Sequence, residues 1–184
     1  MSDSKSKYWI ENRLEQKGLM PKLVKQEIEN EVRQDILEFL RVQEVASLAT
    51  ATPTHWPLVH AVHFATVADE EYRPVFYLFS VPGTRKVHNI NVNTQVSLSV
   101  YNLPGYENRK QAKAFQFMGI AKIVDDAEEL KIALAAQRSK PGYEFTEYLP
   151  LEKQPCIRVD VLYGTWMDQS RKHPLVSIDY LRHV

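Results

Sequence analysis

The spacing of apolar residues changes once along the chain, from a helical repeat to alternation. Over residues 26–43, Ile28, Val32, Ile36 and Leu40 recur every four residues, with charged residues between them. This repeat places the apolar side chains on one face of a helix. We therefore expect an amphipathic helix over residues 26–43, followed by a region of strands.

After this helix, short apolar segments alternate with turn signals, as in β-strands. The predicted strands span residues 45–51, 58–68, 74–80, 95–101, 114–124 and 157–167, and residues 176–178 are a candidate for a short seventh. The first three follow one another closely, which favours an antiparallel meander. No helix of crossover length separates consecutive strands, which argues against a parallel α/β sheet. The sequence predicts a mainly β (α+β) fold, a six-stranded antiparallel barrel with a few flanking helices, because closure removes exposed edges.

The segments outside the strands divide the chain. A length of 184 residues suits one domain. Residues 1–24 are mostly polar and are interpreted as an N-terminal helical arm, which leaves residues 25–184 as the domain. Asp126 begins a helix by the capping-box rule. Residues 139–155 are rich in Pro, Tyr and Glu, and we expect them to form a mobile lid or a subunit contact.

Charge and cysteine content exclude several classes of function. Lys and Arg total 23 and so do Asp and Glu, so the formal net charge is zero. Without a basic field, neither a nucleic acid nor a membrane is expected as a partner. The chain has no apolar signal region near residue 1 and no run of the ~20 apolar residues that a membrane span needs. Cys156 is the only cysteine, which suits a reducing compartment, and we expect a soluble cytoplasmic protein.

The densest group of polar residues outside the surface helices follows the third predicted strand. It contains Ser80, Gly83, Thr84, Arg85 and Lys86, at the start of a short predicted helix with Thr84 as its N-cap. Two hydroxyls, two cations and the amides of a helix N-terminus suit a phosphate dianion. The alternative is that Thr84 caps the helix while both cations are solvated.

Two histidines interrupt the second predicted strand. His60 and His63 are three residues apart, so they lie on opposite faces of the sheet and cannot ligate one metal. For each, a hydrogen-bonded structural histidine is the simpler interpretation. His60 is also a candidate phosphate partner, unless Arg85 lowers its pKa.

No catalytic residue can be identified from the sequence. No histidine pair with metal spacing and no cysteine cluster is present, so we expect no metal site. The sequence has no G-x-S-x-G motif, and Cys156 lies between a proline and an alternating strand. A buried thiol is therefore expected there rather than a nucleophile.

Residues 45–124 resemble the FMN-binding split-barrel family typified by pyridoxamine 5'-phosphate oxidase. The order and spacing of several pieces carry the resemblance: residues 45–50, the strands at 58–68 and 74–80, residues 83–90, 93–98 and 119–124. It implies a split barrel that binds FMN. Arg85 and Lys86 would then bind the phosphate, and Ser80 or Thr84 would donate hydroxyl hydrogen bonds.

The resemblance also implies which strands contact the flavin. Phe79 would line the phosphate site, and the strand that contains His60, Ala61, Val62 and His63 would run beside the ring. The oxidases have Arg at the position of His60. They also have Lys where this chain has Ala65, and Gln where it has Ala114. These departures argue against oxidation of pyridoxamine phosphate.

Together these observations predict an FMN-dependent oxidoreductase that acts on an unidentified small molecule. The resemblance implies a homodimer with the cofactor at the subunit interface. Two alternatives remain open. One is a haem-binding or haem-degrading protein with His173 or His183 as axial ligand, and the other is a non-catalytic flavin-binding dimer.

Overall fold

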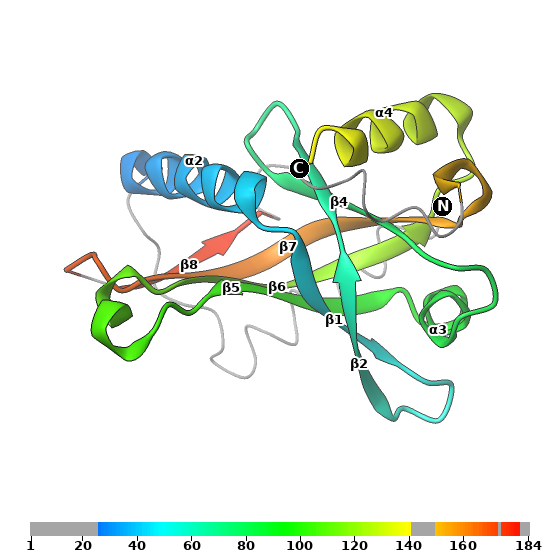
Figure 1. Ribbon diagram of the computed structural model, residues 1–184, viewed down its shortest axis with the longest axis horizontal. Helices are drawn as coiled ribbons and strands as arrows, with labels where there is room; N and C mark the ends of the chain where they lie inside the picture. Colours follow the sequence, from blue (N-terminus) through cyan, green and yellow to red (C-terminus); the bar gives the residue numbers. More distant parts are fainter. Residues whose placement is uncertain (1–25, 141–149, 173, 181–184) are drawn as a thin grey trace.

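An antiparallel sheet with a few helices makes up the described part of the chain (Figure 1). The computed structural model describes residues 26–140, 150–172 and 174–180. The strands are β1 (Val45–Ala51), β2 (Pro57–His63), β3 (Ala65–Ala68), β4 (Pro74–Phe79), β5 (Gln95–Asn102), β6 (Lys113–Ile123), β7 (Cys156–Asp168) and β8 (Leu175–Asp179). The helices are α2 (Gln26–Val42), α3 (Arg85–Val92) and α4 (Ala127–Arg138), with short 3-10 segments η1 (Tyr106–Gln111) and η3 (Leu151–Lys153). The predicted mainly β fold is confirmed.

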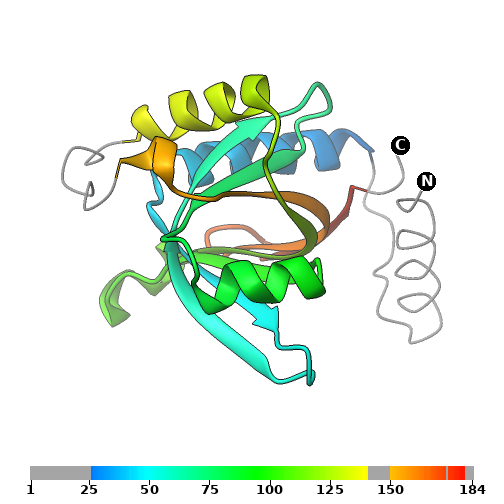
Figure 2. The ribbon, with the colours of Figure 1, turned by 90° about the vertical axis from the view of Figure 1, so that its right-hand side faces the viewer.

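The sheet is curled because two strands that are consecutive in sequence lie at its opposite edges. In the order β2-β1-β5-β6-β7-β4-β3, strands β2 and β3 are the two ends. Only Phe64 separates them, and one extended residue spans at most about 3.6 Å. The Phe64 ring is buried and packs on Phe76, with the ring centroids 5.2 Å apart. This one-residue link bends the sheet into a half-barrel (Figure 2).

The predicted number of strands is wrong. The sheet of the described residues has eight strands rather than six, because the expected strand 58–68 breaks at Phe64 and the candidate strand at 176–178 is present as β8. Both pairings of the expected meander are present, since β1 pairs with β2 and β3 pairs with β4. The break places β2 and β3 at opposite edges, and β4 also pairs with β7. No turn signal occurs at Phe64, so the sequence pattern does not reveal the break.

The main hydrophobic core fills the concave side of the sheet, and α2 packs against it. Leu48 of β1 and Leu98 of β5 are fully buried, as the alternation predicts. Ile36 of α2 is also fully buried. Phe39 lies edge-on to Trp166, with the ring centroids 5.1 Å apart. The amphipathic helix expected over residues 26–43 is therefore confirmed as α2.

A second, smaller cluster lies between β4 and α4 and contains Tyr77, Ala133 and Cys156. The predicted start of α4 is confirmed, since the Asp126 carboxylate accepts a hydrogen bond of 2.7 Å from the amide of Glu129. This cap satisfies one of the free amides at the helix N-terminus.

A bulge in β7 lies opposite a glycine of β6. Met118 pairs with Tyr163 and the next residue, Gly119, pairs with Val161, so Leu162 is the extra residue. A Cβ atom on Gly119 would lie 2.5 Å from the carbonyl oxygen of Asp160, which is too close for any side chain. The bulge bends β7 beside this glycine.

Part of the predicted organisation lies outside the described residues. The arm expected over residues 1–24 is among these, so the division into arm and domain stays a prediction. Most of the segment expected as a lid or subunit contact, residues 141–149, is not described either. Leu151, which follows it, is buried in η3.

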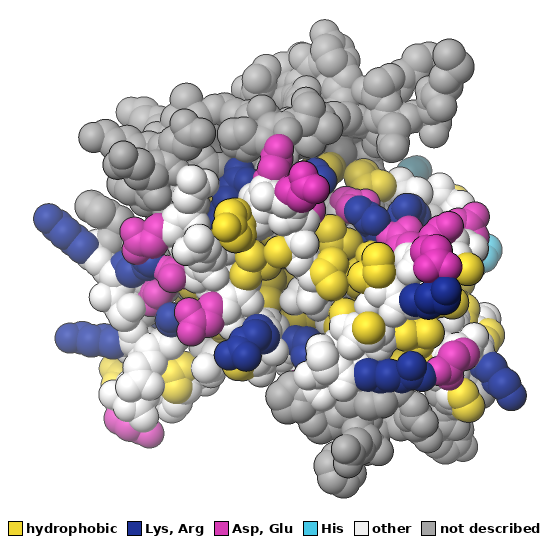
Figure 3. Space-filling model, turned by 90° about the horizontal axis from the view of Figure 1, so that it is seen from above, with side chains coloured by type: hydrophobic (Ala, Val, Ile, Leu, Met, Phe, Trp, Pro, Cys, Tyr) yellow, Lys and Arg dark blue, Asp and Glu magenta, His cyan; other side chains and the backbone are white. Residues whose placement is uncertain are grey.

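The surface that carries α2 and α4 has charged side chains around a central group of hydrophobic ones (Figure 3). On α4, for example, Lys131 pairs with Glu128 at 2.7 Å, and both side chains are exposed. No helix within residues 26–140, 150–172 and 174–180 is long and apolar enough to cross a membrane.

Lys140 joins the end of α4 to the end of α2. Its ammonium group donates to the carbonyl oxygens of Leu40 and Gln43, at 2.8 and 2.6 Å, and lies 4.5 Å from the centroid of the Phe64 ring. The C-terminal carbonyls of a helix have no partner within the helix and carry partial negative charge. Burial lowers the pKa of Lys140 to about 8. This side chain therefore stabilises the position of α2 beside the β2–β3 link.

Replacement of Lys140 by Met should destabilise the protein by about 1–3 kcal/mol, because it leaves the part-buried carbonyl groups without their donor. Urea unfolding followed by circular dichroism measures this loss. Lys131→Met is the matched control, since its exposed ion pair contributes little. Equal unfolding midpoints for the two variants would contradict the role assigned to Lys140.

Candidate functional site

The N-terminus of α3 lacks the cap that the sequence predicts. Thr84 occupies the N-cap position, but its side chain makes no capping hydrogen bond. Its hydroxyl instead lies 2.9 Å from the hydroxyl of Ser80, after a turn in which Gly83 has a φ of 74°. No acidic residue occupies the first turn of α3. The positive end of this helix is therefore not neutralised by its own residues.

Two cations at this helix end have no acidic partner among the residues that the structure describes. Arg85 is exposed and Lys86 is half-buried. Neither forms an ion pair with any described residue. Burial lowers the pKa of Lys86. A partly buried ammonium without a carboxylate has lost hydration that no neighbouring charge replaces, so an anionic ligand would stabilise it.

His60 lies near Lys86 and is held by a buried hydrogen-bonded chain. Its Nε2 atom is 3.2 Å from the Thr50 hydroxyl, and that hydroxyl accepts a hydrogen bond of 2.9 Å from the Asn89 amide. Burial lowers the pKa of His60, and the positive charge of Lys86 lowers it further. The expectation that Arg85 would have this effect is therefore corrected to Lys86. The structure thus brings together His60 and Lys86, which are far apart in sequence.

Strand β2 presents alternate residues to the core and to the outside. His60 faces inward and His63 outward, as expected. The amide of Phe64 donates to the carbonyl of Glu44, so the even-numbered residues of β2 bond to β1. The backbone groups of Ala61 and His63 therefore face the free edge of the sheet.

Two residues predicted at the site are directed elsewhere. The Val62 side chain is 5% exposed and belongs to the main core. The Phe79 side chain packs against the second cluster, under α4. Only the backbone at these positions is available to a ligand, because the strand alternation directs both side chains into packed regions.

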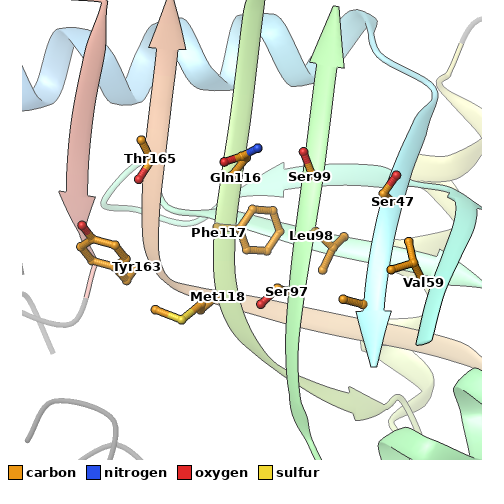
Figure 4. Close-up of a pocket in the computed structure, with 11 residues that line it drawn as sticks. Ser47, Val59, Ser97, Leu98, Ser99, Gln116, Phe117, Met118, Tyr163 and Thr165 are labelled. Atoms are coloured by element: carbon orange, nitrogen blue, oxygen red, sulfur yellow. The ribbon is translucent and has the colours of Figure 1, made fainter. Parts of the chain in front are cut away.

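The sequence interpretation missed a hollow on the outer face of the sheet. It has a volume of about 400 Å³. Ser47, Ser99, Gln116 and Thr165 lie directly opposite one another on successive strands and form a row across it (Figure 4). We call this row the polar ladder. Val59, Ala49, Ser97, Met118 and Tyr163 line the hollow beside it.

None of the residues that line the hollow is charged. Helices α2 and α3 pack against the concave side and α4 packs against β3 and β4, so no described helix covers this face. The signal in the sequence was present: serine, threonine or glutamine at the non-core positions of four strands. It was overlooked because such residues are ordinary on a solvated sheet face.

The partly buried cation Arg158 is paired with carboxylates, unlike the cations at α3. Arg158 bonds to Glu129 at 2.5 Å and to Asp160 at 2.6 Å. These hydrogen bonds lower the pKa of Glu129 against the effect of its burial. The Tyr77 hydroxyl donates to Glu129, and burial is the main reason that its pKa rises to about 12. Lys122 also pairs with Glu129, at 3.3 Å, so this network connects α4 to the sheet with two cations for two carboxylates.

No metal centre is evident in the described ranges. They contain no group of three or more His, Cys, Asp or Glu side chains arranged to hold an ion. The two histidines considered as haem ligands, His173 and His183, lie outside these ranges.

Comparison with known proteins identifies the family. The family model described as pyridoxamine 5'-phosphate oxidase matches residues 32–159, which is more than two thirds of the chain. The chain belongs to this family. No curated protein matches it in sequence.

Several solved structures share the fold. A haem-binding protein from Mycobacterium smegmatis superposes with a TM-score of 0.62 at 16% identity, over 85% of this chain and 60% of that one. A nimC/nimA family protein from Clostridium acetobutylicum has a TM-score of 0.56 at 20% identity, over 82% and 94% of the two chains. A third, described as a putative 5-nitroimidazole antibiotic resistance protein from Bacteroides thetaiotaomicron, has a TM-score of 0.54 at 18% identity, over 72% and 82%. At these identities the similarity shows the fold alone.

The Cys156 thiol should be unreactive in the native protein. It is 2% exposed, and burial is the main reason that its pKa rises to about 12, whereas the thiolate is the reactive form. Titration with a chromogenic disulfide at pH 8 should give almost no reaction in the native state. One equivalent should react after denaturation, because the chain has a single cysteine. Rapid modification of the native protein would contradict this assignment.

Proposed function

We propose that this protein binds FMN, with the phosphate held at the cluster formed by Ser80, Thr84, Arg85, Lys86 and His60. The observation that carries the proposal is the half-buried Lys86, which has no acidic partner among the described residues and whose charge acts on a neutral histidine. A phosphate dianion supplies the missing negative charge. It also accepts hydrogen bonds from the uncapped amides of α3 and from the two hydroxyls.

The edge of β2 suits the flavin ring. The backbone groups of Ala61 and His63 face that edge and are available to hydrogen-bond the polar side of the ring. When bound, FMN would supply hydride or electron transfer, and the protein would supply binding and orientation. The small-molecule substrate is not identified. The differences at His60, Ala65 and Ala114 argue against pyridoxamine phosphate.

We further propose that the protein is a homodimer in which a second copy covers the polar ladder. The face is uncharged, hollow and free of described helices, and its hydroxyl and amide groups can both donate and accept. A two-fold axis places the same surface of both subunits in contact, so such a ladder is complementary to itself. The cofactor would then lie at the margin of this interface.

Haem binding is a second candidate, and a specific observation favours it. One protein with this fold is described as haem-binding, although this chain spans only 60% of its length. The absorbance spectrum of the purified protein distinguishes the candidates, because flavin bands support the proposal and a Soret band supports haem. Bound FMN that no nicotinamide cofactor reduces would favour a non-catalytic flavin-binding dimer.

Arg85→Ala combined with Lys86→Ala should remove FMN while the fold is retained. Each charge-assisted hydrogen bond contributes about 1.5–3 kcal/mol, so the dissociation constant should rise at least tenfold, as measured by quenching of flavin fluorescence. The control is Arg109→Ala with Lys110→Ala, an adjacent Arg–Lys pair in the exposed segment η1. Unchanged affinity in the first variant would remove the phosphate assignment.

Sedimentation equilibrium should report a dimer at micromolar concentration. Ser97→Arg, on the exposed face beside the polar ladder, should shift the protein to a monomer because it buries an unpaired charge at the interface. Ala135→Arg, at an exposed position of α4, should leave the dimer intact. A wild-type monomer that binds FMN would overturn the interface proposal and leave the phosphate site standing.

A further inference from the structure

His60 is held by a buried hydroxyl that can donate to its Nε2 atom or accept from it. The Asn89 amide donates to the Thr50 oxygen at 2.9 Å, which leaves the Thr50 hydroxyl proton free to point at His60 Nε2, 3.2 Å away. A neutral imidazole accepts this bond at Nε2 and carries its proton on Nδ1. Asn89 and Thr50 are 2% and 3% exposed, so they form a rigid buried support.

The same support accepts a protonated histidine. A hydroxyl oxygen has two lone pairs, so Thr50 can accept from Asn89 and from a protonated Nε2 at the same time, with its own proton turned away. No side chain has to move when His60 gains a charge. The cost of protonation therefore comes from the burial of the ring and from the surrounding charges.

Few charged groups face His60. From α3, the Lys86 charge acts on it, while Arg85 and His88 on the same helix are exposed. Strand β1 has no ionisable side chain. Within β2 the other histidine, His63, lies on the opposite face. On β4, the Tyr77 hydroxyl bonds to Glu129 instead. Without a bound anion, the positive charge of Lys86 disfavours protonation of His60. A bound phosphate dianion would make the potential at the ring negative and favour protonation.

We propose that His60 couples ligand binding to proton uptake: it is neutral in the ligand-free protein and takes a proton from solvent when a phosphate monoester docks beside Lys86. This inference rests on the proposed phosphate site and adds its pH dependence. Because binding takes up a proton, this contribution to affinity grows as the pH falls through the titration range of histidine.

The direct test is NMR titration of the histidine ring protons in the full-length wild-type protein, without and with saturating FMN. The His60 signal, assigned by its loss in His60→Gln, should titrate below the ordinary histidine pKa in the free protein. With FMN it should titrate at least about one pH unit higher. Riboflavin, which lacks the phosphate, should leave His60 unchanged.

Binding measurements give a second readout. The FMN phosphate itself titrates near pH 6, so the informative quantity is the ratio of dissociation constants between His60→Gln and wild type. This ratio should rise up to about tenfold between pH 8 and pH 6. His55→Asn, in the exposed turn between β1 and β2, should follow the wild-type profile.

The outcomes separate this inference from the proposal beneath it. If FMN binds and His60 titrates at the same pH with and without it, the proton coupling is overturned and the phosphate site stands. If FMN does not bind the wild-type protein at all, both fail.

Discussion

The link of one residue between β2 and β3 is the constraint on which the rest of the structure depends. Because Phe64 joins strands at opposite edges of the sheet, the sheet must curl. Lys140 supports this link through the Phe64 ring and the end of α2. With the sheet curled, β4 leads through the Gly83 turn into α3, which packs against β1 and β6 and brings Lys86 near His60.

The cluster at α3 is less favourable for local stability than a site in which the charges are paired. The partly buried cation Arg158 has two carboxylate partners, whereas Lys86 has none among the described residues. An unpaired, partly dehydrated charge is unfavourable in isolation. A ligand that supplies the opposite charge removes this free-energy cost. The unpaired charge of Lys86 is therefore better explained by ligand binding than by folding.

The two candidate surfaces differ in electrostatics and lie on opposite faces of the same hairpin. Thr50 and His60 face the concave side, while Ser47 and Val59 face the uncharged hollow. The proposed phosphate site and the proposed subunit interface thus have separate places on one pair of strands. The short β1–β2 hairpin can serve both because side chains in a strand alternate between the faces.

The elements whose signals are local could be predicted from the amino-acid sequence. The repeat of α2, the Asp126 cap, the alternation in β1 and the cations after the Gly83 turn all depend on residues a few positions apart. Three other features became visible only in the folded chain. The strand breaks at Phe64, and the side chains of Val62 and Phe79 point into packed regions. Lys86, rather than Arg85, lowers the pKa of His60. The tertiary structure also aligned Ser47, Ser99, Gln116 and Thr165 into one row. These features depend on strand register and sheet curvature, which arise from contacts between residues distant in sequence and leave no periodic trace in the chain.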